Sequence, residues 1–365
     1  MNDCQSYNGI PAKTPGFFVV RIGFDMGLAI SKLTIRGYKS IRSLEDFELR
    51  NLNILIGPNG AGKSNFVEFF RIMEEISKGG EKSLEHYVQH MGGADKLLFL
   101  GAKVTPLIEV YISTVDACAS FELEATRVDK LKYVQMPVIG TDKFGLLSEG
   151  IYRDHKSYHF HDTSDFAAVK RPCSKRDYEY LRPDASNLAA FLLQLKKKHE
   201  REYSSIREVI QLAAPFFDDF WLREEDDEDD ILLEWREKGS DYPFHPSQIS
   251  DGTLRFICLA TALLQPDPPS TILLDEPELG LHPYALTLLA GLIQKASKQT
   301  QVIVSTQSAP LIDHFEPEDI VVVERQNGKS IFKRLDKAGL KAWLDDYSLG
   351  ELWQKNVFGG RPARE

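Results

Sequence analysis

Cysteine is scarce in this chain of 365 residues, and basic residues are outnumbered by acidic ones. The four cysteines include no CxxC pair, which argues against a disulfide-rich scaffold and fits free thiols in a reducing compartment. The formal net charge of −10 argues against a basic nucleic-acid surface over the whole chain, although a local basic patch would not show in this sum. A hydrophobic content of 42% is enough for one large domain or two ordinary ones.

Long apolar runs are also absent. No run reaches the roughly 20 residues that a membrane helix needs, and the N-terminus lacks a basic segment followed by a long apolar one. We therefore expect a cytoplasmic protein with no membrane partner. Residues 1–27 contain turn formers and little periodicity, which predicts a flexible N-terminal arm and leaves both Met1 and Met26 open as the start. The acidic run at 224–230 predicts a solvated loop.

The hydrophobic pattern of the remaining chain predicts a mixture of strands and helices. Alternating or wholly apolar runs predict strands at 30–41, 47–57, 231–235, 271–278, 301–306 and 319–326. Residues 107–139 contain three strand-like runs, which predict an antiparallel sheet. Helical spacing predicts helices at 65–77, 250–264 and 283–296, and two more within 184–214. The latter segment is too short for a long coiled-coil arm, because one helix of that length would span less than about 50 Å.

The stretch GPNGAGKS fits the phosphate-binding pattern G-x-x-x-x-G-K-[ST]. Glycines permit the curl that turns backbone N–H groups inward as an anion nest, and the following helix directs its positive end at the anion. We expect Lys63 to contact the β- and γ-phosphates of ATP and Ser64 to ligate Mg²⁺. The predicted nucleotide-binding residues of this segment are Gly57, Pro58, Asn59, Gly60, Ala61, Gly62, Lys63, Ser64 and Asn65.

A second motif, ILLDEPE, places two carboxylates at the end of an apolar strand. In doubly wound sheets, ligands bind at this end of the strands. Asp275 suits coordination of Mg²⁺, and Glu276 suits a general base that takes a proton from the attacking water. A long segment separates Lys63 from Glu276, which predicts a large insertion between the two halves of the site.

The order phosphate loop, insertion, ISDGTLR, ILLDEPE, LGLHP and VIVSTQS resembles an ABC-type ATPase head of the RecF/SMC/OLD kind. More narrowly, it resembles the compact predicted ATPases of the AAA_21 group. The segments GYKSIRSLEDFELRNLNILIGPNGAGKSN, GGADKLLFLG and SLGELWQKNVFGG carry the likeness over residues 28–360.

The resemblance implies an α/β fold: an ABC-type P-loop NTPase head with a mixed twisted sheet, a flanking antiparallel sheet and a small helical lobe. Residues 28–360 are expected to form a single head, in which 102–245 hold the antiparallel sheet and the inserted lobe. Residues 361–365 would form a tail. No TOPRIM nuclease is expected, because the segment after Arg325 is too short and lacks its acidic constellation.

The same resemblance assigns roles to further residues. Ser250 and Gly252 occupy the place of the ABC signature, which contacts the γ-phosphate held by the other protomer of an ATP-dependent homodimer. Asp251 departs from the usual glycine there. Lys39 lies where SMC-like heads place a basic residue near the nucleotide. Gln307 stands at the position of the switch histidine, and we expect it to sense the γ-phosphate as a hydrogen-bond donor.

Some interpretations stay open. Residues 278–282 match the D-loop, which would line the dimer interface, and Gln89 is a candidate for the Q-loop glutamine. The basic cluster at 196–201 could contact a phosphate backbone, although a solvated helix face is the commoner explanation. The histidines in HKSYHFH lack the cysteine or carboxylate spacing of a zinc site.

Two classes of function compete. The first is an ATPase that powers or gates a DNA-related process, such as repair or phage defence, with an effector partner such as a nuclease or toxin. The second is a slow or non-hydrolysing, ATP-controlled scaffold that holds a separate effector. Glutamine cannot take up a proton near neutral pH, so Gln307 favours the scaffold, whereas Glu276 favours turnover. A transporter ATPase is disfavoured by the RGYKS segment and by the unusual signature.

Overall fold

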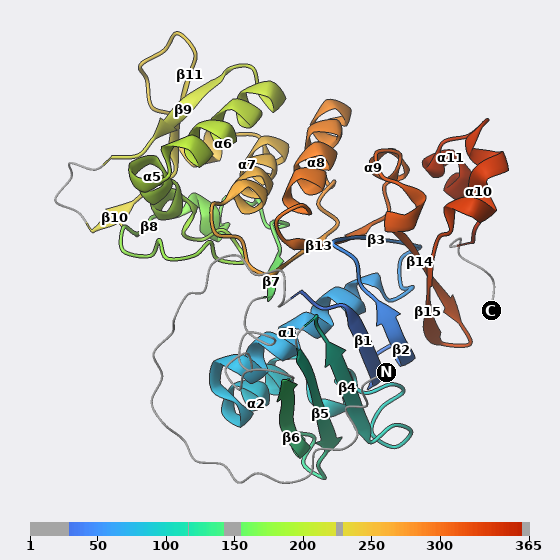
Figure 1. The fold of residues 1–365 in the computed structure, drawn as a ribbon. Helices are drawn as coiled ribbons and strands as arrows, with labels where there is room; N and C mark the ends of the chain where they lie inside the picture. The colour runs from blue at the N-terminus through green and yellow to red at the C-terminus, as the bar shows by residue number, and fades with distance from the viewer. Residues whose placement is uncertain (1–28, 116, 142–154, 224–228, 360–365) are drawn as a thin grey trace. The chain divides into compact units, whose positions relative to one another are not determined.

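The computed structural model describes residues 29–115, 117–141, 155–223 and 229–359 (Figure 1). The predicted N-terminal arm, most of the acidic run and the tail at 361–365 lie outside these residues. The chain forms two compact units. The first contains Met1–Arg50, Glu68–His155 and Arg325–Ile331, and the second contains Asn51–Val67, Lys156–Glu324 and Phe332–Glu365.

The first unit contains an antiparallel sheet with the strand order β2-β1-β4-β5-β6. Its strands are β1 (Lys32–Tyr38), β2 (Ile41–Glu48), β4 (Leu107–Ser113), β5 (Ala117–Ala125) and β6 (Leu131–Thr141). The antiparallel sheet predicted within 107–139 is confirmed, because β4, β5 and β6 pair consecutively. The single strand predicted at 30–41 is wrong: the chain turns at Lys39, whose φ is 45°, and returns as β2.

Helices α1 (Lys63–Gly79), α2 (Glu81–His90) and α3 (Ala94–Leu97) follow the phosphate loop. Helix α1 begins in the second unit and continues into the first. In β4, Ile108, Val110 and Ile112 are buried while the residues between them are more exposed, as expected for a strand with one face on a core.

A six-stranded sheet, most of whose residues belong to the second unit, has the order β15-β14-β3-β13-β12-β7. Its strands are β3 (Leu52–Ile56), β7 (His155–Tyr158), β12 (Thr271–Asp275), β13 (Gln301–Thr306), β14 (Ile320–Gln326) and β15 (Lys329–Arg334). The strands β12, β13, β3 and β14 are parallel, which explains their continuous apolar runs. The strand predicted at 47–57 is wrong as one element, since its residues are divided between β2 and β3 in different sheets.

Helices and short strands complete the second unit. They are α5 (Leu188–Lys198), α6 (Glu200–Ala213), α7 (Asp251–Leu264), α8 (Pro283–Ala296), α9 (Ala309–Ile312), α10 (Lys337–Leu344), α11 (Leu349–Gln354), β8 (Cys173–Ser174), β9 (Phe217–Trp221), β10 (Asp230–Ile231) and β11 (Glu234–Glu237). The two helices predicted within 184–214 are confirmed, with the break at His199. The strand predicted at 231–235 is wrong as one element, because β10 pairs with β8 and β11 pairs with β9.

Helix α7 is apolar on almost every side, which predicts burial within the core of the unit. Its N-cap is Ser250, whose hydroxyl accepts a hydrogen bond from the backbone N–H of Thr253 at 3.2 Å. Helix α8 begins with Pro283 after the N-cap His282, and it packs against α7 and β13 (Figure 1). Helix α8 thus supports both α7 and a parallel strand that precedes one of the polar motifs.

The register of the parallel strands aligns their carboxyl ends. Asp275, the last residue of β12, lies opposite Ser305, and Thr306, the last residue of β13, lies opposite Ile56 of β3. The residues that follow these strands therefore emerge at one edge of the sheet, where parallel α/β sheets bind ligands.

Cys173 and Cys258 are free thiols, as expected for these two residues. No helix within the described part of the chain is long and apolar enough to cross a membrane.

Candidate active site

The phosphate loop connects the end of β3 to the start of α1. Gly60 and Gly62 have φ values of 78° and 111°, a region that side chains other than glycine rarely adopt. The backbone N–H of Ala61 donates to the carbonyl of Pro58 at 3.2 Å and closes the turn. The strand, glycine-rich turn and helix that the motif requires are therefore present in this order.

Gly57 is required by the packing of the sheet. A Cβ atom at this position would lie 2.1 Å from the carbonyl oxygen of Val323 in the neighbouring strand β14. Sequence reasoning explained the glycines by the curl of the loop, and the structure adds this close approach of two backbones.

Lys63 is almost completely buried, at 4% exposure. Its ammonium donates to the carbonyls of Gly57 at 2.7 Å and Pro58 at 3.1 Å. Burial lowers the pKa of Lys63, while the negative charges after β12, that of Glu276 foremost, raise it. The charged side chain is thus held inside the loop, where phosphate oxygens could replace the two carbonyls as acceptors.

Ser64 and Asp275 meet across the site. The Ser64 hydroxyl donates to Asp275 Oδ1 at 3.4 Å, although the two residues come from α1 and β12. Two hard oxygen ligands at this spacing fit Mg²⁺, which usually takes one or two protein oxygens and completes its shell with water and phosphate. Within the described residues, no group of three or more His, Cys, Asp or Glu side chains could hold a metal ion.

Glu276 follows β12 in an unusual backbone conformation, with a φ of 44°. Its backbone N–H donates to the carbonyl of Ser305 at 2.7 Å, which fixes this turn against β13. The amide nitrogen of Gln307 donates to Glu276 Oε1. A left-handed conformation at a non-glycine residue costs on the order of 1–3 kcal/mol, and such costs often occur at functional sites. The structure thus brings the predicted base and the predicted sensor into direct contact.

Glu278 is a site residue whose role sequence reasoning missed. Its Oε1 accepts hydrogen bonds from the Thr306 hydroxyl at 2.5 Å and from the backbone N–H of Gln307 at 3.0 Å. Burial raises the pKa of Glu278, and these two hydrogen bonds lower it in part. The only signal in the sequence was a second carboxylate two residues after Glu276, which the D-loop interpretation assigned to a dimer interface.

The signature residues lie at the N-terminus of α7. A Cβ atom at Gly252 would lie 2.4 Å from the carbonyl oxygen of Gly280, so the helix start abuts the turn that follows β12. Asp251, the departure from the usual glycine, is exposed and lies 3.8 Å from the ammonium of Lys170. Lys170 is itself buried, and its ammonium donates to the carbonyl of Thr163 at 2.6 Å. Its positive charge therefore lies close to the negative charge of Asp251.

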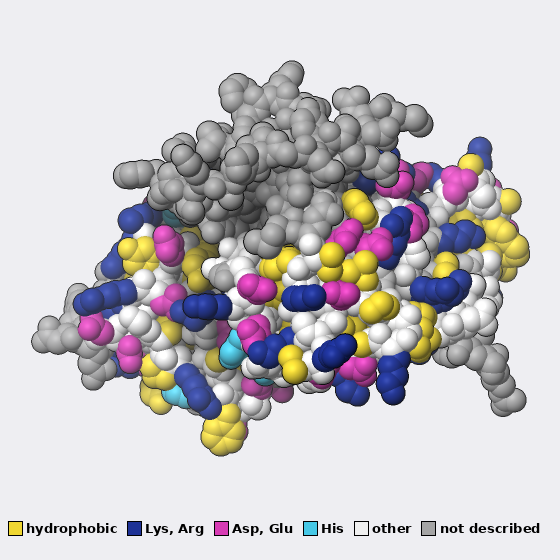
Figure 2. All heavy atoms as spheres, turned by 90° about the horizontal axis from the view of Figure 1, so that it is seen from below, with side chains coloured by type: hydrophobic (Ala, Val, Ile, Leu, Met, Phe, Trp, Pro, Cys, Tyr) yellow, Lys and Arg dark blue, Asp and Glu magenta, His cyan; other side chains and the backbone are white. Residues whose placement is uncertain are grey.

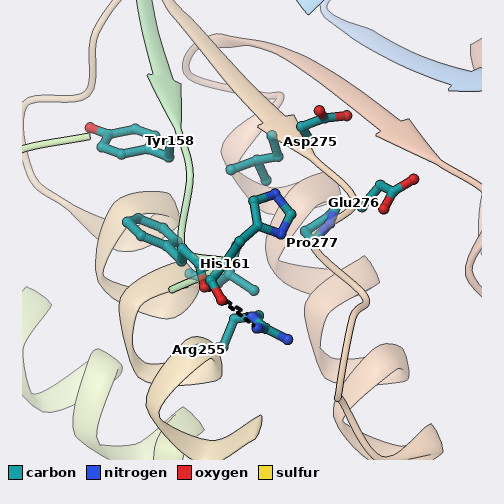
Figure 3. Close-up of a pocket in the computed structure, with 9 residues that line it drawn as sticks. Tyr158, His161, Arg255, Asp275, Glu276 and Pro277 are labelled. Atoms are coloured by element: carbon teal, nitrogen blue, oxygen red, sulfur yellow. Dashed lines mark hydrogen bonds between the residues drawn. The ribbon is translucent and has the colours of Figure 1, made fainter. Parts of the chain in front are cut away.

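Arg255 connects α7 to two other segments of the site. Its guanidinium donates to the carbonyls of Phe160 at 2.9 Å and His161 at 3.1 Å (Figure 3), and also to that of Leu279. A small pocket lies at the carboxyl end of β12, and its lining residues are Tyr158, Phe160, His161, Arg255, Leu259, Leu274, Asp275, Glu276 and Pro277. Sequence reasoning missed Arg255, whose only signal was a cation one helical turn after the signature.

Comparisons with known proteins agree with this geometry. Residues 144–313 match the AAA_21 family, described as "AAA domain, putative AbiEii toxin, Type IV TA system", and residues 32–97 match the AAA_23 family, described as an AAA domain. Over these two segments the chain is similar to AAA domains of these families. No curated protein matches its sequence.

Solved SMC heads share the fold of this chain. One is an Smc head bound to the C-terminal winged-helix domain of ScpA, with a TM-score of 0.59 and 19% identity over 85% of this chain and 99% of that one. Another is an Smc head with an extended coiled coil bound to the C-terminal domain of ScpA, derived from Pyrococcus furiosus. Its TM-score is 0.57, with 17% identity over 87% of this chain and 99% of that one. The predicted α/β class and P-loop ATPase head are confirmed.

The remaining candidate residues belong to other elements of the chain. Lys39 is in the first unit, at the turn between β1 and β2, and its ammonium lies 2.5 Å from the carboxylate of Glu68. Its role near the nucleotide stays a prediction. Gln89 is an exposed residue of α2 in the same unit. In the basic cluster, Lys196 lies 3.5 Å from Asp219.

Proposed function

We propose that this chain binds ATP with Mg²⁺ and hydrolyses it. The observation that carries the proposal is the convergence of a buried lysine, a hydroxyl–carboxylate pair and a carboxylate–amide pair at the aligned ends of β3, β12 and β13. Parallel sheets bind nucleotides at this edge, and each of these groups has a role in phosphoryl transfer.

In this proposal, Lys63 exchanges its two carbonyl acceptors for β- and γ-phosphate oxygens. Ser64 and Asp275 hold Mg²⁺, which supplies positive charge against the phosphate oxygens when it is bound. Glu276 orients the attacking water and takes its proton. Gln307 fixes one oxygen of Glu276 through its amide nitrogen, and this leaves the other oxygen for the water.

We propose further that two heads enclose two ATP molecules. Ser250 and Gly252 of one protomer would face the γ-phosphate held by the other, with the N-terminus of α7 directed at that anion. Binding of ATP would favour the closed dimer and hydrolysis would release it, because the contacts depend on the γ-phosphate.

The process that this cycle powers or gates is proposed to be DNA-related, such as repair or phage defence, with a nuclease or toxin as effector. The similar Smc heads were solved with a domain of ScpA, which supports a protein partner for this head as well. Figure 2 shows basic and acidic side chains interspersed over the described part of one face, which offers DNA no contiguous basic surface there.

The test is steady-state ATP hydrolysis by the purified chain beside the variants Glu276→Gln and Lys63→Ala. We expect wild type to turn over and both variants to lose at least about a hundredfold in kcat, since each loses a group that acts on the reacting phosphate or water. Binding of a fluorescent ATP analogue separates the two, because Lys63→Ala should also lose affinity while Glu276→Gln should keep it. Turnover that survives in both variants would indicate a contaminating enzyme.

A scaffold controlled by ATP is the second candidate, and one observation favours it. An amide at position 307 holds Glu276 without a titratable proton, which would suit slow turnover. If wild type binds ATP, Lys63→Ala does not, and none of the three proteins turns over, the scaffold becomes the better explanation.

A further inference from the structure

We propose that Glu278 is a positioning residue that places Gln307 against Glu276, an inference that rests on the proposed hydrolysis at this site. Gln307 makes one contact with each of two acids in the same turn. Its side-chain amide donates to Glu276, and its backbone N–H donates to Glu278 Oε1 at 3.0 Å.

The anchoring extends to both neighbours of Gln307. The Thr306 hydroxyl donates to Glu278 Oε1 at 2.5 Å and accepts the backbone N–H of Ser308 at 2.9 Å. Ser308 in turn caps α9 through a bond from the N–H of Leu311 at 3.2 Å. Glu278 Oε1 therefore holds the backbone of Thr306 and Gln307 in place, and this backbone positions the side chain of Gln307.

The second oxygen of Glu278 takes no part in this anchoring. Its Oε2 is buried and makes no hydrogen bond within the described residues. Since both donors converge on Oε1, the requirement at this position is an acceptor in the right place, and an amide oxygen can supply it as well as a carboxylate can.

Glutamine needs such anchoring more than histidine does. Its side chain has more rotatable bonds than an imidazole, so a larger share of its conformations would miss Glu276 if the backbone were free. The Glu278 contacts remove the backbone freedom and leave only the side chain to be ordered. The chain thus compensates for the replacement of the switch histidine.

Two substitutions distinguish the effect of where the acceptor atom of residue 278 lies from the effect of its negative charge. Glu278→Gln keeps an acceptor at the position of Oε1 and removes the charge, whereas Glu278→Asp keeps the charge and withdraws the acceptor by one methylene. We expect Glu278→Asp to lower kcat by about tenfold, with the KM for ATP within about threefold, and Glu278→Gln to stay within about threefold of wild type. Glu208→Asp, an exposed glutamate of α6, is the matched control and should change nothing.

A double-mutant cycle tests whether Glu278 acts through Gln307. In a Gln307→Ala background, Glu278→Asp should cost no more than about a further twofold in kcat, because its target is already gone. A full tenfold loss in that background would show an independent role and overturn the inference. The inference would also be overturned if Glu278→Gln lowered kcat while Glu278→Asp kept the wild-type value.

Hydrogen exchange at the backbone N–H of Gln307 tests the inference even if the chain has no ATPase activity. The Glu278→Asp variant should exchange this amide faster than wild type, and Glu278→Gln should exchange it at the wild-type rate. Absence of turnover in wild type would contradict the proposed function alone. Equal exchange in all three proteins would contradict the role of Glu278.

Discussion

At the scale of single residues, burial and neighbouring polar or charged groups have opposite effects on the pKa values of two side chains in the site. Lys63 is buried beside several carboxylates, and its pKa is lowered by burial although their charges oppose this. The pKa of Glu278 is shifted upward, in the direction opposite to that of Lys63, because burial disfavours the charged form of an acid and so raises its pKa. A triphosphate would add negative charge to this environment, which favours the charged form of Lys63 and makes Mg²⁺ necessary as a counter-charge.

The raised pKa of Glu278 predicts a pH-dependent cost to stability. A group whose pKa is higher in the folded state contributes stability below its unfolded pKa and loses it as the pH rises through the folded value. The unfolded value is close to 4.5, so the loss occurs above that pH. We expect Glu278→Gln, which does not titrate, to gain in unfolding free energy relative to wild type as the pH rises above about 4.5.

Urea denaturation across this range measures the difference between the two proteins. The exposed Glu208→Gln is the control and should give a difference that does not change with pH. A constant difference for Glu278→Gln as well would mean that Glu278 titrates alike in the folded and unfolded chains.

At the scale of helices, two glycines illustrate how neighbours decide the effect of one methyl group. Gly252 begins α7 with a carbonyl oxygen 2.4 Å from where its Cβ would lie. Gly291, on the exposed face of α8, has nothing within 4 Å of that point. The same residue type is therefore a packing requirement in one helix and a conformational cost in the other.

The substitution Gly→Ala should have opposite signs in the two helices. Gly291→Ala should raise the unfolding free energy by about 0.5–1 kcal/mol, because alanine favours the helix and reduces the entropy of the unfolded chain. Gly252→Ala should lower it by about 1–3 kcal/mol, because the turn at Gly280 must move. Urea midpoints at a constant m-value provide the comparison, and a stabilised Gly252→Ala would show that the turn yields easily.

At the scale of the whole molecule, the nucleotide site contains its phosphate loop, acids and sensor within the second unit, while the signature lies at the N-terminus of a helix in the same unit. The proposed sandwich requires a second copy to bring a signature to each γ-phosphate. The assembly state should therefore follow the nucleotide.

We expect Glu276→Gln to form a stable dimer with ATP and Mg²⁺, since it would bind nucleotide without hydrolysing it. Sedimentation should show a mass rising from 41.4 kDa to about twice that value on addition of ATP. Lys63→Ala should stay monomeric under the same conditions. A dimer that forms without ATP, or with Lys63→Ala, would separate assembly from the nucleotide site.

Local chemistry was readable directly from the sequence. The loop at 57–64, the acids after 271–274 and the glutamine after 301–306 were recognisable because glycine spacing, apolar runs and terminal polar residues are local patterns. The helix at 283–296 was predicted to the residue, since a histidine cap and a proline mark its start. Runs that cross from one sheet to another, such as 47–57, could not be divided correctly, because no glycine or proline separates the two parts.

Only the tertiary structure decided which of these groups meet. The hydrogen bonds from Gln307 to Glu276 and Glu278, and the contacts of Arg255, join segments far apart in the chain. Periodicity tells which face of a strand is buried and carries no information on which strand lies beside it. The sequence by itself therefore determined that this chain has a phosphate-loop motif, acidic residues after one apolar strand and a glutamine after the next, and strand pairing determined that these residues lie together.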